Sequence, residues 1–156
     1  VALTNWGFAL GRLADAAAGE EQRHLLLEAI SKYEAALKIK PDMHLALNNW
    51  GIALVHLAHR SESDDERGEL LTQAEAVLQR HAVIVGHASY NLACVAAMRR
   101  DVGRFVEIAD GLPDVELPDA KHLREDKDLH GIRETPEFQA WWTRKFGHEP
   151  LVKPVA

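Results

Sequence analysis

Apolar residues recur along this chain at the spacing of amphipathic helices. The clearest stretches place apolar residues at i, i+3 and i+7, in Leu3, Trp6 and Leu10 and again in Leu47, Trp50 and Leu54. A helix of 3.6 residues per turn brings such positions onto one face, which is then available to pack against a neighbour. The pattern predicts a succession of helices.

The two stretches belong to an internal repeat. Residues 2–14 (ALTNWGFALGRLA) and 46–58 (ALNNWGIALVHLA) share nine identities in thirteen positions at a separation of 44 residues. A weaker third copy begins near His87 and places Ala93 where the earlier copies have Gly7 and Gly51. Glycine within a helix costs up to about 1 kcal/mol relative to alanine, so we expect a second helix to approach closely at these positions.

Each of the first two copies is expected to be a helical hairpin. The second helix of the first hairpin carries Ala29, Tyr33 and Ala36 on one face and ends before Pro41, which cannot continue a helix. Turns are predicted at residues 17–21 and 61–65, and Ser63 with Glu66 three residues later forms a capping box that begins a helix.

This arrangement resembles the tetratricopeptide repeat, whose pattern places a tryptophan, small residues and a closing proline at fixed intervals in a helical hairpin. The matching residues are Leu3, Trp6, Gly7, Leu10, Ala29, Tyr33 and Pro41. The first two hairpins each contain roughly ten more residues than that pattern. The resemblance implies an all-α, right-handed superhelical stack of antiparallel hairpins, an α-solenoid, closed by short C-terminal capping helices.

The C-terminal part resembles the closing segment of bacterial tetratricopeptide arrays. The motifs are YNLACVAAMRRD at 90–101 and HLREDKDLHGIRETPEFQAWW at 122–142. Asp119 is expected to cap one short helix, and Thr135 with Pro136 to begin the last one, on which Trp141 and Trp142 supply an apolar face. This resemblance implies the C-terminal part of a larger bacterial multidomain protein.

The expected organisation is a single domain made of three repeats and a cap. The boundaries are repeat 1 at 1–41, repeat 2 at 42–85, repeat 3 at 86–113, the C-terminal cap at 114–147 and a tail at 148–156.

Composition narrows the expected partners and location. A net charge of −6 disfavours binding to a phosphate backbone, and no apolar run approaches the roughly 20 residues that span a membrane. We therefore expect neither a nucleic acid nor a membrane as partner. The single cysteine fits a reducing compartment, and the cytoplasm is the expected location.

No grouping of residues indicates catalysis or a cofactor. His56 and His59 lie three residues apart, but no third ligand stands at a diagnostic spacing, so no metal is expected. Cys94 is expected to be a packing residue rather than a reactive thiol, which would need a nearby cation or a helix N-terminus. The chain is therefore expected not to be an enzyme.

By resemblance to tetratricopeptide arrays, the first helices of the hairpins would line a concave groove. The expected groove residues are Thr4, Asn5, Phe8, Arg12, Asn48, Asn49, Ile52, His56, Tyr90, Asn91, Cys94 and Met98. The equivalent asparagines Asn5, Asn49 and Asn91 have an alternative role, which is to satisfy backbone groups between helices.

The expected function is a scaffold that binds a protein or peptide segment. The alternative is self-assembly into a homo-oligomer through the apolar edge formed by Leu3, Trp6 and Leu10.

Overall fold

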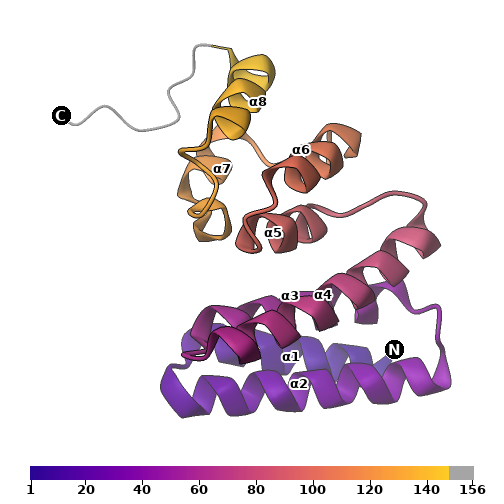
Figure 1. Ribbon diagram of the computed structural model, residues 1–156. Helices are drawn as coiled ribbons and strands as arrows, with labels where there is room; N and C mark the ends of the chain where they lie inside the picture. Colours follow the sequence, from indigo (N-terminus) through magenta and orange to yellow (C-terminus); the bar gives the residue numbers. More distant parts are fainter. Residues whose placement is uncertain (148–156) are drawn as a thin grey trace. The chain divides into compact units, whose positions relative to one another are not determined.

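The computed structural model describes residues 1–147, and every regular element among them is a helix (Figure 1). The predicted all-α fold of paired helices, as in an α-solenoid, is confirmed. The chain divides into two compact units, of which the first is Val1–Gly86 and the second begins at His87. The predicted tail at 148–156 lies outside the described residues.

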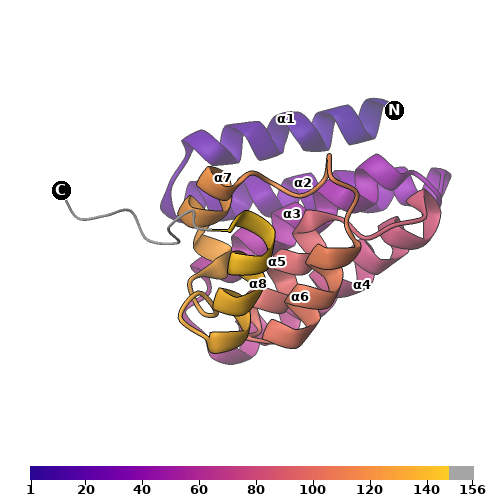
Figure 2. The same ribbon diagram turned by 90° about the horizontal axis from the view of Figure 1, so that it is seen from above.

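The first unit consists of two long antiparallel hairpins. Its helices are α1 (Ala2–Ala16), α2 (Gly19–Ile39), α3 (His44–Arg60) and α4 (Asp64–Val85). In Figure 2, α1 lies at the edge of this unit, with α2 beside it. The turns fall within the predicted ranges, so the additional residues of each repeat lengthen its helices.

Two glycines set how closely the helices of each hairpin approach. A Cβ added at Gly7 would lie 2.6 Å from a ring carbon of Tyr33 on α2, and one added at Gly51 would lie 2.5 Å from Leu78 on α4. Both distances are shorter than van der Waals contact. The expected close approach of a second helix at these two positions is therefore confirmed.

The apolar core of the first unit joins three helices. Ala14 of α1, Leu26 of α2, and Ala53 and Leu57 of α3 form one buried cluster. Each is at most 4% exposed. The second hairpin is thus attached to the first through α2 and α3.

The second unit is built from shorter helices. They are α5 (Tyr90–Met98), α6 (Val102–Gly111), α7 (Ala120–Glu125), the 3-10 helix η1 (Lys127–Leu129) and α8 (Pro136–Phe146). As predicted, Asp119 and Thr135 cap α7 and α8, since their side chains accept hydrogen bonds from the backbone N–H groups of His122 and Phe138.

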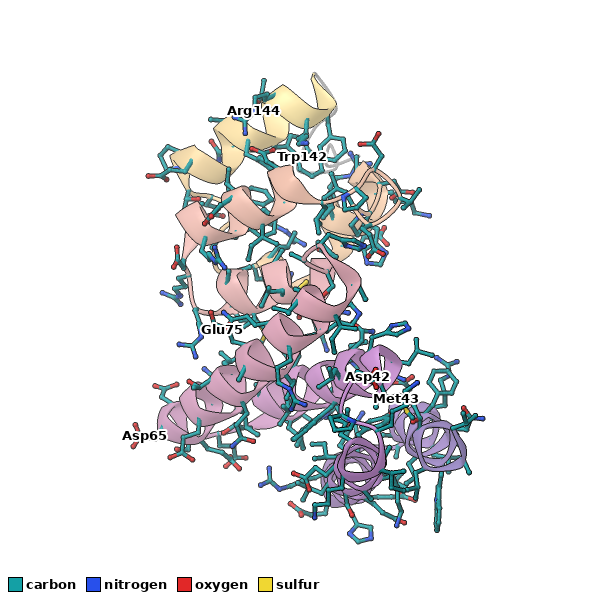
Figure 3. All side chains as sticks on the ribbon, turned by 90° about the vertical axis from the view of Figure 1, so that its right-hand side faces the viewer. Asp42, Met43, Asp65, Glu75, Trp142 and Arg144 are labelled. Atoms are coloured by element: carbon teal, nitrogen blue, oxygen red, sulfur yellow. The ribbon has the colours of Figure 1, made fainter. Side chains whose placement is uncertain are left out.

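An aromatic core holds the last helix in place within this unit. Phe105 lies 5.4 Å from Phe138 and 5.1 Å from Trp141, measured between ring centroids. Trp142, labelled in Figure 3, is 3% exposed, and the Arg124 guanidinium of α7 lies 5.9 Å from its ring centroid. Both tryptophans are therefore core residues, as the sequence indicated.

Candidate functional site

A cavity of about 210 Å³ lies within the first unit, between α1, α2 and α3. Its walls come from both hairpins, because α1 and α2 belong to the first and α3 to the second. The lining residues are Phe8, Gly11, Arg12, Asp15, Leu26, Tyr33, Asn49, Ile52, Ala53 and His56. We refer to this as the first-unit cavity.

The inner part of the first-unit cavity is mostly apolar. Leu26 and Tyr33 are 1% and 2% exposed, and Ile52 is half-buried. Burial raises the pKa of the Tyr33 hydroxyl to about 12, so it stays protonated at neutral pH and can donate a hydrogen bond. Phe8 is 54% exposed, which leaves its ring available to a ligand.

One side of the cavity is polar. The Arg12 guanidinium lies 3.2 Å from one carboxylate oxygen of Asp15, and Nδ1 of His56 lies 3.8 Å from the other. Asp15 therefore stands between two groups that bear or can acquire positive charge. The amide of Asn49 adds a donor and an acceptor to the same lining.

The structure brings five of the predicted groove residues together around this cavity. They are Phe8, Arg12, Asn49, Ile52 and His56. The other lining residues were not predicted from the sequence. Asp15 in particular follows Phe8 and Arg12 at i+7 and i+3, so continuing that helical face by one turn would have identified it.

The other predicted groove residues of the first unit lie elsewhere. Thr4 is buried, and its hydroxyl donates a hydrogen bond to the sulfur of Met43 over 2.7 Å; Figure 3 labels Met43. Asn5 is exposed and Asn48 half-buried. None of these three residues lines the first-unit cavity.

The predicted groove residues of the third repeat belong to the second unit. Tyr90, Asn91 and Met98 are half-buried, whereas Cys94 is 3% exposed. Burial raises the pKa of the Cys94 thiol, and the nearby Asp126 carboxylate adds to the effect. A protonated, buried thiol is a packing group rather than a nucleophile.

The side chains around Cys94 form a polar cluster inside the second unit. Tyr90 donates a hydrogen bond of 2.6 Å to Asp126, whose other carboxylate oxygen accepts from the backbone N–H of Asp128. Cys94, Asp126 and Asp128 bring one potential metal ligand each to within 4.8 Å of one another. However, both oxygens of Asp126 already accept hydrogen bonds, and the raised thiol pKa opposes the thiolate that a metal requires. The arrangement serves to attach η1 to α5.

A second cavity, of about 520 Å³, is polar and lies at the hairpin turns of the first unit. Arg23 and Glu66 form an ion pair of 2.7 Å in its wall. A hydrogen bond from Ser61 lowers the pKa of Glu66 most, and a hydrogen bond from Arg23 lowers it further. Because acidic and basic side chains both line this cavity and pair with one another, it has no preference for a charged ligand.

Among the described residues, no helix combines the length and the apolar character that crossing a membrane requires.

Residues 2–85 match the family model of the plant-specific mitochondrial import receptor subunit TOM20. The matched residues coincide with the first unit and therefore include every residue that lines the first-unit cavity. No curated protein and no solved structure matches the chain.

Two expectations from the sequence were wrong. A bacterial source was expected, whereas the matching family is specific to plants. A cytoplasmic location was expected, whereas the family is that of a mitochondrial import receptor subunit. Both errors have the same origin: helical periodicity and packing motifs determine a fold, and the same hairpins serve proteins of different sources and compartments.

Proposed function

The chain belongs to the family of the plant-specific mitochondrial import receptor subunit TOM20, and we propose from this membership that it recognises proteins destined for import. A short segment of such a protein would bind in the first-unit cavity. The observation that carries the proposal is that this cavity joins exposed Phe8 of α1 to Ile52 and His56 of α3, all within the matched residues. A receptor recognises its ligand without converting it, so no catalytic residue is assigned.

The size of the cavity supports a side chain as its occupant. Pockets that enclose a whole small molecule measure about 300–1,000 Å³, whereas this one measures about 210 Å³. A single large apolar side chain of a protein segment fits that volume. It would contact Phe8 and Ile52 at the mouth and Leu26 deeper inside.

The net charge of the chain favours a segment that also carries basic residues. Within the cavity, Asp15 is 40% exposed and is paired with Arg12, so the attraction comes from the chain as a whole. The chain as a whole carries a net charge of −6, which attracts a basic segment before contact. We therefore propose an amphipathic segment with one apolar face and nearby basic side chains.

The expected affinity is modest. Burying one leucine-sized side chain contributes about 1.5–3 kcal/mol, while a micromolar Kd requires about 8 kcal/mol. Further contacts along α1 and α3 must supply the remainder. Weak binding suits a receptor that passes its ligand on.

Phe8 provides the direct test, because a ring that is 54% exposed can be removed with little effect on folding. The probes are fluorescently labelled synthetic peptides of two kinds: basic amphipathic helices with leucines on one face, and the same compositions scrambled. We expect Phe8→Ala to weaken binding of the amphipathic peptides about 10-fold, a loss of about 1.4 kcal/mol. Asp15→Asn should weaken binding less, and only at low salt.

Val83→Ala is the matched control, because Val83 is an 84% exposed apolar residue outside the cavity lining. It should leave the Kd unchanged. Equal binding of amphipathic and scrambled peptides, or binding that Phe8→Ala does not alter, would contradict the proposal.

A further inference from the structure

A second face of α1 carries an exposed apolar stripe that the cavity does not use. It consists of five residues separated alternately by four and three positions, Ala2, Trp6, Ala9, Leu13 and Ala16. All five are exposed, Trp6 by 52% and Leu13 by 59%. Alternate spacing of four and three is that of a helix that packs lengthwise against another helix. We call these five residues the α1 stripe.

The α1 stripe is distinct from the other two faces of the helix. Thr4, Gly7, Leu10 and Ala14 are its buried residues, whereas Phe8, Gly11, Arg12 and Asp15 line the cavity. The self-assembly edge expected from the sequence is therefore divided between faces, since Leu10 is buried and Leu3 half-buried while Trp6 is exposed. Neither core packing nor the cavity accounts for the α1 stripe.

The internal repeat reveals how the same stripe is used elsewhere in the chain. Ala2, Trp6, Ala9 and Leu13 recur 44 residues later without change, as Ala46, Trp50, Ala53 and Leu57 of α3. There, Ala46, Ala53 and Leu57 are at most 4% exposed, and Trp50 is half-buried. Four identical residues are thus covered in one repeat and exposed in the other.

The helix that contributes most side chains to the cover of the α3 copy is α2, while Leu70 of α4 and Ala14 of α1 also pack there. Ala53 and Leu57 share a buried cluster with Leu26 of α2, and Leu25 and Ile30 of α2 pack against that cluster. A helix that covers the stripe would therefore need leucine and isoleucine side chains four residues apart, as Leu26 and Ile30 are in α2. In the first unit, α2 also contacts α1 through Ala14 and the other buried residues of α1, and it leaves the five residues of the α1 stripe exposed.

We propose that the α1 stripe is a docking surface for an amphipathic helix of a partner protein with the apolar pattern of α2. Lys32, whose Nζ lies 4.2 Å from the centroid of the Trp6 ring, borders the stripe on one side. A helix of 15 residues is about 22 Å long. One such face is too small for the roughly 800 Å² per partner of a stable dimer, so a single docked helix suits it better than a second copy of the chain.

A peptide of residues 19–39, which is the sequence of α2, tests the proposal against the full chain. We expect the labelled peptide to bind with rising fluorescence anisotropy, and a peptide with Leu26→Glu to bind at least 10-fold more weakly. The substitution Leu13→Glu in the full chain should cause the same loss. Leu45→Glu, at a residue of α3 that is 58% exposed and outside the stripe, should have no effect.

Two results of the peptide-binding experiment would overturn the proposal. One is the absence of binding at millimolar peptide. The other is binding that Leu13→Glu leaves unchanged, because the peptide would then be replacing the chain's own α2 rather than occupying the stripe. Circular dichroism of each variant verifies that it folds.

Light scattering tests the remaining occupant, a second copy of the chain. We expect a monomer across the concentrations used for binding. A dimer that Leu13→Glu dissociates would overturn the proposal by assigning the stripe to self-association.

Discussion

At the scale of single residues, two glycines determine the spacing of the helices in the first unit. Gly7 faces the ring of Tyr33, and Gly51 faces Leu78, a fully buried side chain. Their function was predictable from the sequence, because helix propensity alone argues against glycine at equivalent places in two copies. The partner residues were not predictable, since they depend on how the helices cross.

Gly51→Ala is expected to destabilise the protein by about 1–3 kcal/mol, the usual cost of overfilling a packed core. The new Cβ would lie 2.5 Å from Cγ of Leu78, a fully buried side chain. Any gain in helix propensity, at most about 1 kcal/mol, is smaller. Urea unfolding followed by circular dichroism measures the change.

Gly68→Ala is the matched control for this prediction. Gly68 also lies inside a helix, but a Cβ added there meets nothing within 4 Å. It should stabilise the protein by about 0.5–1 kcal/mol. If both substitutions shifted the unfolding midpoint in the same direction, close packing at Gly51 would not be the reason for the glycine.

At the scale of the helices, starts and ends were predicted well because their signals are local. Ser63, Asp119 and Thr135 each accept a hydrogen bond from a backbone N–H three residues later, as their sequence contexts indicated. Glu66 was less predictable. Its carboxylate pairs with Arg23 from the other hairpin and with the Ser61 hydroxyl, so a tertiary contact determines where that side chain lies.

Asp110 attaches the last helix to α6. Its carboxylate accepts hydrogen bonds from the Trp141 indole N–H over 3.1 Å and from Arg144 over 2.7 Å, and Lys145 lies 3.3 Å away. Partial burial would raise the pKa of Asp110, but the hydrogen bonds from Arg144, Lys145 and Trp141 outweigh it and lower the pKa. The ionised carboxylate therefore stabilises the second unit.

The lowered pKa of Asp110 gives a stability contribution with a definite pH dependence. It is present above the ordinary aspartate pKa of about 3.9 and is lost as the pH falls through the lower pKa of the folded state. Asp110→Asn should cost up to about 1 kcal/mol at pH 7, since the group is partly exposed. Thermal unfolding of both proteins from pH 7 to pH 3 should show the difference shrinking at the acidic end. A difference that stayed constant with pH would assign the loss to packing.

At the scale of the whole molecule, the candidate site was only partly predictable. The repeat indicated which helices would line a groove, and five of the expected residues surround one cavity. Leu26 and Tyr33 of α2 were missed because groove residues were expected only on the first helix of each hairpin. Thr4 was predicted to line the groove because of its position in the repeat, although it is buried and contacts Met43. Whether a helical position faces a cavity or a neighbour depends on the packing of adjacent helices.

The division of the chain leads to a prediction about the first unit alone. The compact unit Val1–Gly86 coincides with the family match over residues 2–85, although the first is defined by the fold and the second by the sequence. This unit contains its own buried cluster around Leu26, and α4 ends at Gly86, whose φ of 86° suits the left-handed end of a helix.

We therefore expect a fragment of residues 1–86 to fold without the remainder of the chain. It should show a single cooperative thermal transition by circular dichroism and bind the amphipathic peptides within about threefold of the full chain, a difference of about 0.7 kcal/mol. In the fragment, as in the full chain, Phe8→Ala should weaken that binding and Val83→Ala should not. A fragment that folds but loses binding would contradict the assignment of the binding site to the first unit alone.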